Sequence, residues 1–75
     1  MREIIIGKTY KHFKGHLCKV IDIVFDSGNY PNKMVIYEEI DNKTKWARPY
    51  DMFNSKVDKE KYPDVEQVYR FEEVK

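Results

Sequence analysis

The sequence predicts a mainly β fold, because turn-favouring residues recur at short intervals and β-branched or aromatic segments lie between them. The turn signals lie at Gly7, Lys14-Gly15, 26–29, Pro31-Asn32, 41–43, Pro49 and 62–64. The chain of 75 residues is expected to form one domain, residues 1–75, and its six Tyr, four Phe and one Trp supply large rings for a small core. Five strands and one helical turn in this length indicate a small, partly open barrel. We prefer an SH3-like barrel, with an OB-like barrel as the alternative.

The first two strands are expected at Lys8–Phe13 and Leu17–Phe25, joined by a turn at Lys14-Gly15. In the second strand the apolar residues occupy both faces: Leu17, Ile21, Ile23 and Phe25 on one, and Cys18, Val20 and Val24 on the other. Such a strand is either buried on both sides or contains a bulge that switches faces midway. We prefer the bulge, because a long, bent second strand commonly serves both halves of a barrel.

The next two strands are expected at Lys33–Ile40 and Thr44–Ala47, with a tight turn at residues 41–43 between them. Pro49 cannot donate to a sheet ladder, so the strand ends there. Residues Pro49–Ser55 then fit one helical turn with Met52 and Phe53 facing inward. Residues Val65–Val74 are expected to form a closing strand, with a short helix as the alternative. The sequence leaves open whether residues 4–6 pair as an edge strand within one molecule or with a second copy.

The composition is that of a globular protein, with 41% hydrophobic and 36% charged residues. No apolar run approaches the roughly 20 residues that a membrane-spanning helix needs, and the lone Cys18 cannot form an internal disulfide. We therefore expect a cytoplasmic protein. The net charge is +1, but residues 1–25 sum to +3 and residues 51–75 to −2. This spread fits either a mild basic pole or two ordinary solvated faces.

The first candidate ligand-binding cluster is Tyr10, His12, Phe13 and Lys14, in which aromatic and basic residues interleave. This mixture is typical of a nucleic-acid or phosphate-binding face. The alternative is a plain hairpin in which Tyr10 packs inward and the remaining side chains are solvated.

The second candidate is Trp46 with Arg48, whose side chains share a face if the segment is extended, because a strand has a period of two. The two side chains could form a cation–π pair and stack on a base or bind an anionic group. The alternative is that the only Trp fills the core. Tyr37 and Arg70 complete the proposed set, since they too are polar-tipped residues embedded in apolar segments.

Catalytic and metal chemistry have little support in the sequence. His12, His16 and Cys18 share one parity, but a turn separates them and a structural zinc takes four ligands, so we expect no metal site and no cofactor. Cys18 lies in an apolar strand, where a thiol is typically inert. Glu38 and Glu39 are adjacent and therefore point to opposite faces of a strand. We expect no enzymatic activity.

Four blocks of sequence together resemble the small bacterial domain-of-unknown-function 1653 family. They are Gly7-x-x-Tyr10-x-His12-Phe13-Lys14-Gly15, Val35-Ile36-Tyr37, Trp46-Ala47-Arg48-Pro49-x-x-Met52-Phe53 and Arg70-Phe71. The resemblance covers residues 7–71 and implies a short cytoplasmic protein with an SH3-like β fold. It implies no particular activity.

These patterns favour a non-enzymatic binding module that uses its aromatic and basic face for nucleic acid or another anionic ligand. The alternative is an SH3-like protein- or peptide-interaction domain, with Tyr10, Tyr37, Trp46 and Tyr50 lining its groove. No membrane contact is expected, and the molecule should be a monomer or a weak homodimer.

Overall fold

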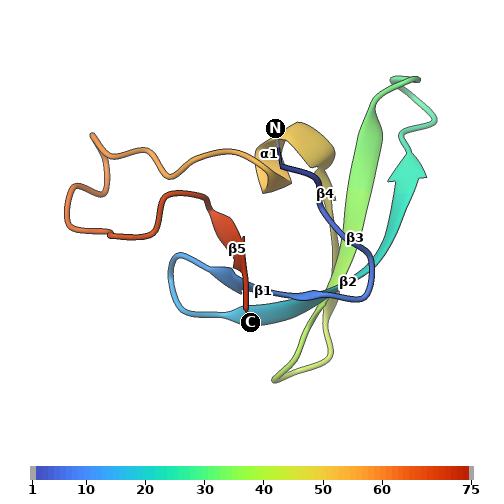
Figure 1. The fold of residues 1–75 in the computed structure, drawn as a ribbon. Helices are drawn as coiled ribbons and strands as arrows, with labels where there is room; N and C mark the ends of the chain where they lie inside the picture. Colours follow the sequence, from blue (N-terminus) through green and yellow to red (C-terminus); the bar gives the residue numbers. More distant parts are fainter. Residues whose placement is uncertain (1, 75) are drawn as a thin grey trace.

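The computed structural model describes residues 2–74 and shows one antiparallel sheet with a short helix (Figure 1). Its elements are β1 (Thr9–His12), β2 (Leu17–Phe25), β3 (Lys33–Glu39), β4 (Lys45–Pro49), α1 (Tyr50–Phe53) and β5 (Phe71–Glu73). The five strands follow the order β4-β3-β2-β1-β5, so β4 and β5 are the two edges. This is the mainly β, partly open barrel that the sequence predicts, with one helical turn.

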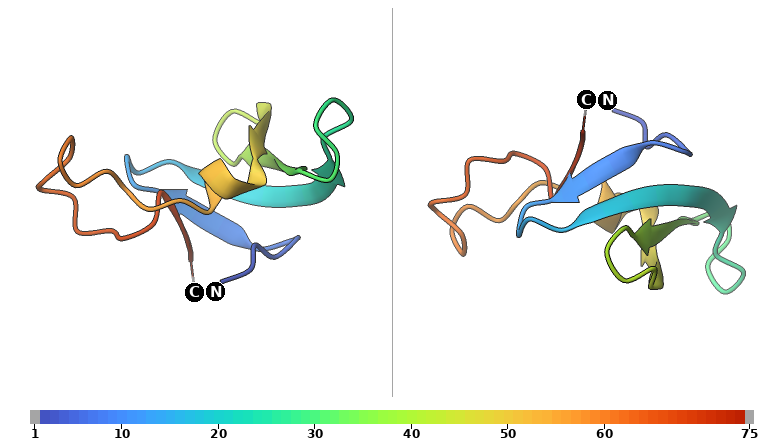
Figure 2. Two further views of the ribbon diagram at one scale, coloured as in Figure 1. Left: turned by 90° about the horizontal axis from the view of Figure 1, so that it is seen from above. Right: turned by 90° about the horizontal axis from the view of Figure 1, so that it is seen from below.

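The bulge expected in the second strand is present. Val20 pairs with Tyr37 and Asp22 pairs with Ile36, so Ile21 is an extra residue without a partner on β3. Cys18 and Val20 are buried before the bulge, and Ile23, of the opposite parity, packs against the core after it. β2 therefore curves along its length (Figure 2) and contributes to the core on both sides of the bulge.

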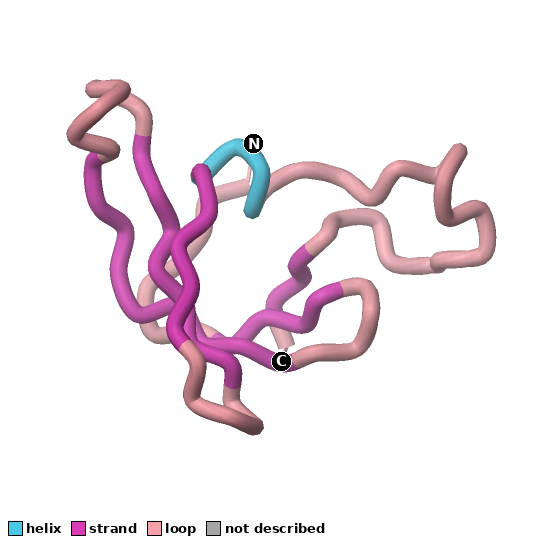
Figure 3. Tube along the Cα trace, turned by 180° about the vertical axis from the view of Figure 1, so that it is seen from behind, coloured by secondary structure: helices cyan, strands magenta, loops and turns pink. Residues whose placement is uncertain are grey.

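The predicted strand at residues 65–74 is wrong for residues 65–70 and for Val74, because only Phe71–Glu73 form β5. The short-helix alternative is also wrong. The physical reason lies in β1, which pairs with β5 from Tyr10↔Glu73 to His12↔Phe71 and then turns at Gly15, where φ is 103°. Before Phe71 the chain has no full strand beside it. Residues 54–70 form a long loop that extends away from the sheet (Figure 3), and its two arms meet only at an isolated antiparallel bridge between Lys56 and Tyr69.

The helical turn lies within the predicted range 49–55 but is shorter, because α1 covers only Tyr50–Phe53 and Pro49 is still the last residue of β4. Only one of its two predicted core residues is buried. Phe53 is 0% exposed, whereas Met52 is 49% exposed. Successive residues of a helix point about 100° apart, so a single turn directs one of these neighbours into the core and the other away from it.

The core is built around the ring of Phe53. Its ring stacks on that of Phe71, with centroids 4.0 Å apart and planes 7° apart, and meets those of Tyr10 and Tyr37 at 5.6 and 5.3 Å. Val20 and Val35 are fully buried beside this aromatic group. Residues from β1, β2, β3, α1 and β5 thus share one core.

The N-terminal segment, residues 2–6, covers one side of this core without joining the sheet. Ile4 is buried, and its backbone N–H donates to the hydroxyl of Tyr50 at 2.9 Å. The N–H of Ile5 donates to the hydroxyl of Tyr10 at 3.0 Å. Within the described chain, residues 4–6 therefore do not form an edge strand of the sheet. The hydroxyls of Tyr50 and Tyr10 accept the backbone N–H groups of Ile4 and Ile5 instead.

This arrangement predicts very different costs for truncating two neighbouring residues. Phe53→Ala should lower the free energy of unfolding by about 3–5 kcal/mol, because it removes the ring at the centre of the core. Met52→Ala should change it by less than about 0.5 kcal/mol. Urea unfolding followed by tryptophan fluorescence measures both. If Phe53→Ala is already unfolded in water, Phe53→Leu replaces it, and equal effects at the two positions would contradict this description of the core.

Candidate functional site

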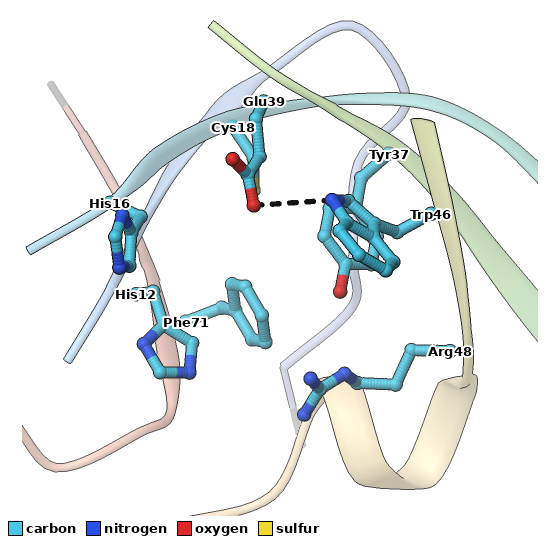
Figure 4. A pocket seen from close by; sticks show the side chains of 8 residues that line it. All are labelled: His12, His16, Cys18, Tyr37, Glu39, Trp46, Arg48 and Phe71. Atoms are coloured by element: carbon cyan, nitrogen blue, oxygen red, sulfur yellow. Dashed lines mark hydrogen bonds between the residues drawn. The ribbon is translucent and has the colours of Figure 1, made fainter. Parts of the chain in front are cut away.

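A pocket of about 200 Å³ opens on the concave face of the sheet. Figure 4 shows the eight side chains that line it: His12, His16, Cys18, Tyr37, Glu39, Trp46, Arg48 and Phe71. They come from all five strands and from the β1–β2 turn.

Strand register explains why these side chains face the same space. Cys18 lies opposite Glu39, and Tyr37 lies opposite Trp46. Directly paired residues of an antiparallel sheet point to the same face, as do residues two apart on one strand. Arg48 follows Trp46 by two positions, so it joins the same row.

The pocket lies where the barrel is open. Trp46 and Arg48 belong to the edge strand β4, whereas Phe71 belongs to the opposite edge strand β5. The guanidinium carbon of Arg48 lies 5.4 Å from the centroid of the Phe71 ring. A cation–π contact thus spans the two edges, which no backbone ladder joins within the described residues.

Trp46 is not a core residue, because 49% of it is exposed. Its indole Nε1–H donates to Oε1 of Glu39 at 3.1 Å, and Oε2 of Glu39 accepts from Nδ2 of Asn42 at 3.0 Å. Trp46 and Arg48 share a face as predicted. The guanidinium, however, lies over Phe71, so the expected Trp46–Arg48 cation–π pair is replaced by one with Phe71.

His12 packs between two aromatic rings at one end of the pocket. Its ring stacks on Phe13 at 4.5 Å and meets Phe71 edge-on at 4.9 Å. Nδ1 accepts the backbone N–H of Lys14 at 3.1 Å, which leaves the proton of the neutral ring on Nε2. Burial, and then the charges of Arg48, His16, Lys14 and Arg70, lower the pKa of His12 to about 4.

The predicted cluster at residues 10–14 divides between the core and the surface. Tyr10 is only 2% exposed and its hydroxyl accepts from the backbone N–H of Ile5, so it is a core residue and does not line this pocket. Phe13 and Lys14 lie beside the pocket, where Phe13 meets Tyr62 at 5.0 Å and Nζ of Lys14 lies 5.6 Å from the Tyr62 ring. These three residues are called the Phe13 surface below.

The two remaining predicted residues differ in position. Tyr37 is buried, and its hydroxyl faces the pocket (Figure 4). Arg70 does not line the pocket, but it lies close enough for its charge to lower the pKa of His12. Its backbone carbonyl accepts the N–H of Phe13 at 2.9 Å, which ties the start of β5 to the end of β1.

Sequence reasoning missed Glu39, Phe71 and Tyr62 as residues of the site. Strand alternation was available for Glu39, because it follows Tyr37 by two positions and therefore shares its face. Glu38 points the other way, as expected, and pairs with Lys45 at 3.3 Å. Phe71 and Tyr62 could not be found in this way, since the curl of the sheet brings Phe71 to the pocket and the long loop brings Tyr62 to Phe13 beside it.

The pocket also brings His12, His16 and Cys18 together, although a turn separates them in sequence. Within residues 2–74 no group of three or more His, Cys, Asp or Glu side chains is arranged to hold a metal ion. Burial, followed by the charge of Glu39, raises the pKa of the Cys18 thiol to about 11. Cys18 is therefore protonated near neutral pH and is a poor nucleophile.

The fold and pocket define a small open β barrel with an aromatic, partly basic cavity at its opening. A family model, "Protein of unknown function (DUF1653)", matches residues 8–73, which include every pocket residue. The chain belongs to this family. Comparisons with curated proteins and with solved structures found no match. In the described part of the chain, no helix has the length and apolar character to cross a membrane.

The environment of His12 predicts a measurable pH dependence of stability. Its pKa is lowered from 6.5 to about 4 in the folded state, so the unfolded chain takes up this proton first as the pH falls. The titration of His12 should therefore lower the free energy of unfolding as the pH falls from about 6.5 to about 4. His12→Gln should remove that part of the decrease, whereas His16→Gln should retain most of it.

Urea unfolding at several pH values measures the effect on stability, and the NMR signal of the His12 ring reports its titration directly. A His12 midpoint near 6.5 would show that neither burial nor the surrounding cations act on this ring.

Proposed function

We propose that this protein is a non-enzymatic module that binds single-stranded nucleic acid through the pocket and the adjoining Phe13 surface. The observation that carries the proposal is a half-exposed Trp46 in the same pocket as the guanidinium of Arg48. Aromatic platforms combined with cations are the usual means of binding single strands, because every base has a face to stack on and every nucleotide carries a phosphate.

The charges around the pocket support an anionic ligand. The single salt bridge among residues 2–74 joins Lys45 to Glu38, so Arg48, Lys14 and Arg70 have no carboxylate partner there. Burial is the main cause of the lowered pKa of His12, and the charges of Arg48, His16, Lys14 and Arg70 lower it further. A phosphate group near Arg48, Lys14 and Arg70 would gain charge-assisted hydrogen bonds.

The aromatic rings support a ligand with several bases. Beyond Trp46, the partly exposed rings of His12, Phe13 and Tyr62 form a continuous series, with neighbouring centroids 4.5 and 5.0 Å apart. The pocket of about 200 Å³ is smaller than the roughly 300–1,000 Å³ of drug-sized ligand sites. A pocket of this volume would hold one base, and the adjacent bases of the same strand would lie along the Phe13 surface.

A groove for an extended peptide has less support. Two of the four tyrosine and tryptophan residues proposed to line it, Tyr10 and Tyr50, use their hydroxyls to bind the backbone of Ile5 and Ile4. Tyr37 and Trp46 remain for such a groove. The peptide alternative would be favoured by binding that is insensitive to salt, because stacking and apolar contacts release few counterions.

The proposal includes no reaction and places the protein in the cytoplasm. The high pKa of the Cys18 thiol supports the first part, because it removes the one candidate nucleophile in the pocket. The lone cysteine, which cannot form an internal disulfide, supports the second.

The proposal predicts salt-dependent binding of a short mixed-sequence oligonucleotide that depends on Trp46. Three phosphate contacts, from Arg48, Lys14 and Arg70, would give a slope of log K against log salt of about −2. Trp46→Ala should weaken binding by about 1–3 kcal/mol through the loss of one stacked base.

Fluorescence anisotropy with a labelled oligonucleotide measures both quantities. Phe25→Ala is the matched control, because Phe25 is also an exposed aromatic residue but lies at the far end of β2, outside the pocket. Equal losses in the two variants, or no binding at low salt, would contradict the proposal.

A further inference from the structure

The pocket holds two opposite charges that do not neutralise one another. Glu39 and Arg48 both line it, yet they form no salt bridge in the described structure. Figure 4 shows the carboxylate at one end of the pocket and the guanidinium at the other, with Tyr37 and Phe71 between them. A ligand that fills the pocket therefore meets an acceptor group at one end and a donor group at the other.

Glu39 is fixed in position and still has capacity to bind. Its two oxygens accept from Trp46 and Asn42, at 3.1 and 3.0 Å. A carboxylate has about four lone-pair sites, so two acceptor positions remain. The hydrogen bond from Trp46 also fixes the position of the exposed indole, which offers a stacking surface, relative to the carboxylate of Glu39, which offers an acceptor.

Guanine is the base whose edges match this arrangement. Its N1–H and N2–H₂ groups are neighbouring donors that one carboxylate can accept, and they are free in a single strand. Its O6 and N7 are neighbouring acceptors on another edge, and an arginine that binds both is the commonest base-specific contact in protein–DNA complexes. Adenine and thymine alternate donors and acceptors along an edge, and cytosine has two neighbouring acceptors, N3 and O2, beside a single donor group. None of the three therefore offers a neighbouring donor pair to Glu39 together with an acceptor pair to Arg48.

We infer that the pocket selects guanine, with Glu39 accepting from its N1 and N2 groups, Arg48 donating to O6 and N7, and Trp46 stacking on the ring. This inference rests on the proposed function, because it names the base that the same site prefers. The other ligand of suitable shape, a lysine or arginine side chain of a protein partner, is disfavoured because Arg48 lines the pocket and Lys14 and Arg70 lie near enough to act on His12, and none of the three has a carboxylate partner in the described structure.

The test uses single-stranded hexamers in which five nucleotides are thymidine and the third carries guanine, adenine, cytosine, hypoxanthine or 7-deazaguanine. The all-thymine hexamer is the reference. A single guanine avoids the association of guanine-rich strands. The guanine hexamer should bind at least about 5-fold more tightly than the adenine, cytosine and all-thymine hexamers. Hypoxanthine lacks the N2 amino group that Glu39 would bind, and 7-deazaguanine lacks the N7 that Arg48 would bind, so each should lose most of this preference in the unaltered protein.

Variants separate the base contact from general binding. Glu39→Gln should reduce binding of the guanine hexamer to about the level of the hypoxanthine hexamer, with little effect on the all-thymine hexamer. Glu38→Gln is the matched control, because Glu38 is the adjacent residue and pairs with Lys45 on the other face of the strand. It should leave the guanine preference unchanged.

The outcomes separate guanine selection from nucleic-acid binding in general. Equal binding of all hexamers, or a preference for another base, would overturn the guanine inference and leave the proposed function in place. A loss of all binding in Glu39→Gln, including that of the all-thymine hexamer, would show that Glu39 only positions Trp46. No binding of any hexamer at low salt, with binding of an arginine-rich peptide instead, would overturn both proposals.

Discussion

The stack of Phe71 on Phe53 is the contact on which both the core and the pocket depend. One face of Phe71 completes the buried aromatic group at a centroid distance of 4.0 Å. The same side chain meets the imidazole of His12 and lies under the guanidinium of Arg48. In a chain of 75 residues there is little material for a separate site. Phe71 therefore belongs to both the core and the pocket, and the packing that fixes its ring in the core also fixes it in the pocket.

Much of the fold could be predicted because its signals are local. The apolar residues on both faces of residues 17–25 indicated the bulge, and Pro49 marked the end of β4. The extent of β5 could not be predicted in this way. Its length is decided by the four residues of β1 that are available to pair with it. Residues 65–70 have suitable side chains for a strand, but β1 does not continue beside them. The backbone that does lie there, residues 55–57, forms only one isolated bridge, between Lys56 and Tyr69.

The candidate site shows a different limit of sequence reasoning. Alternation assigns a residue to a face of a strand, but it does not say how deep along that face the residue lies. Tyr10 and His12 have the same parity on β1, yet Tyr10 packs on Phe53 in the core and His12 reaches the pocket. Trp46 and Arg48 were placed together correctly, because they are two apart on one strand. Their aromatic neighbour Phe71 comes from the opposite edge, and only the curl of the whole sheet brings it there.

The N-terminal segment has a consequence for where this domain begins. The family match starts at residue 8, whereas the buried side chain of Ile4 lies upstream of it. The hydroxyls of Tyr50 and Tyr10, which accept from the backbone of residues 4 and 5, would lose these donors if the chain were cut at the start of the match. Such a cut would also remove the buried side chain of Ile4 from the core cluster. The structural unit is therefore longer than the stretch by which the family is recognised.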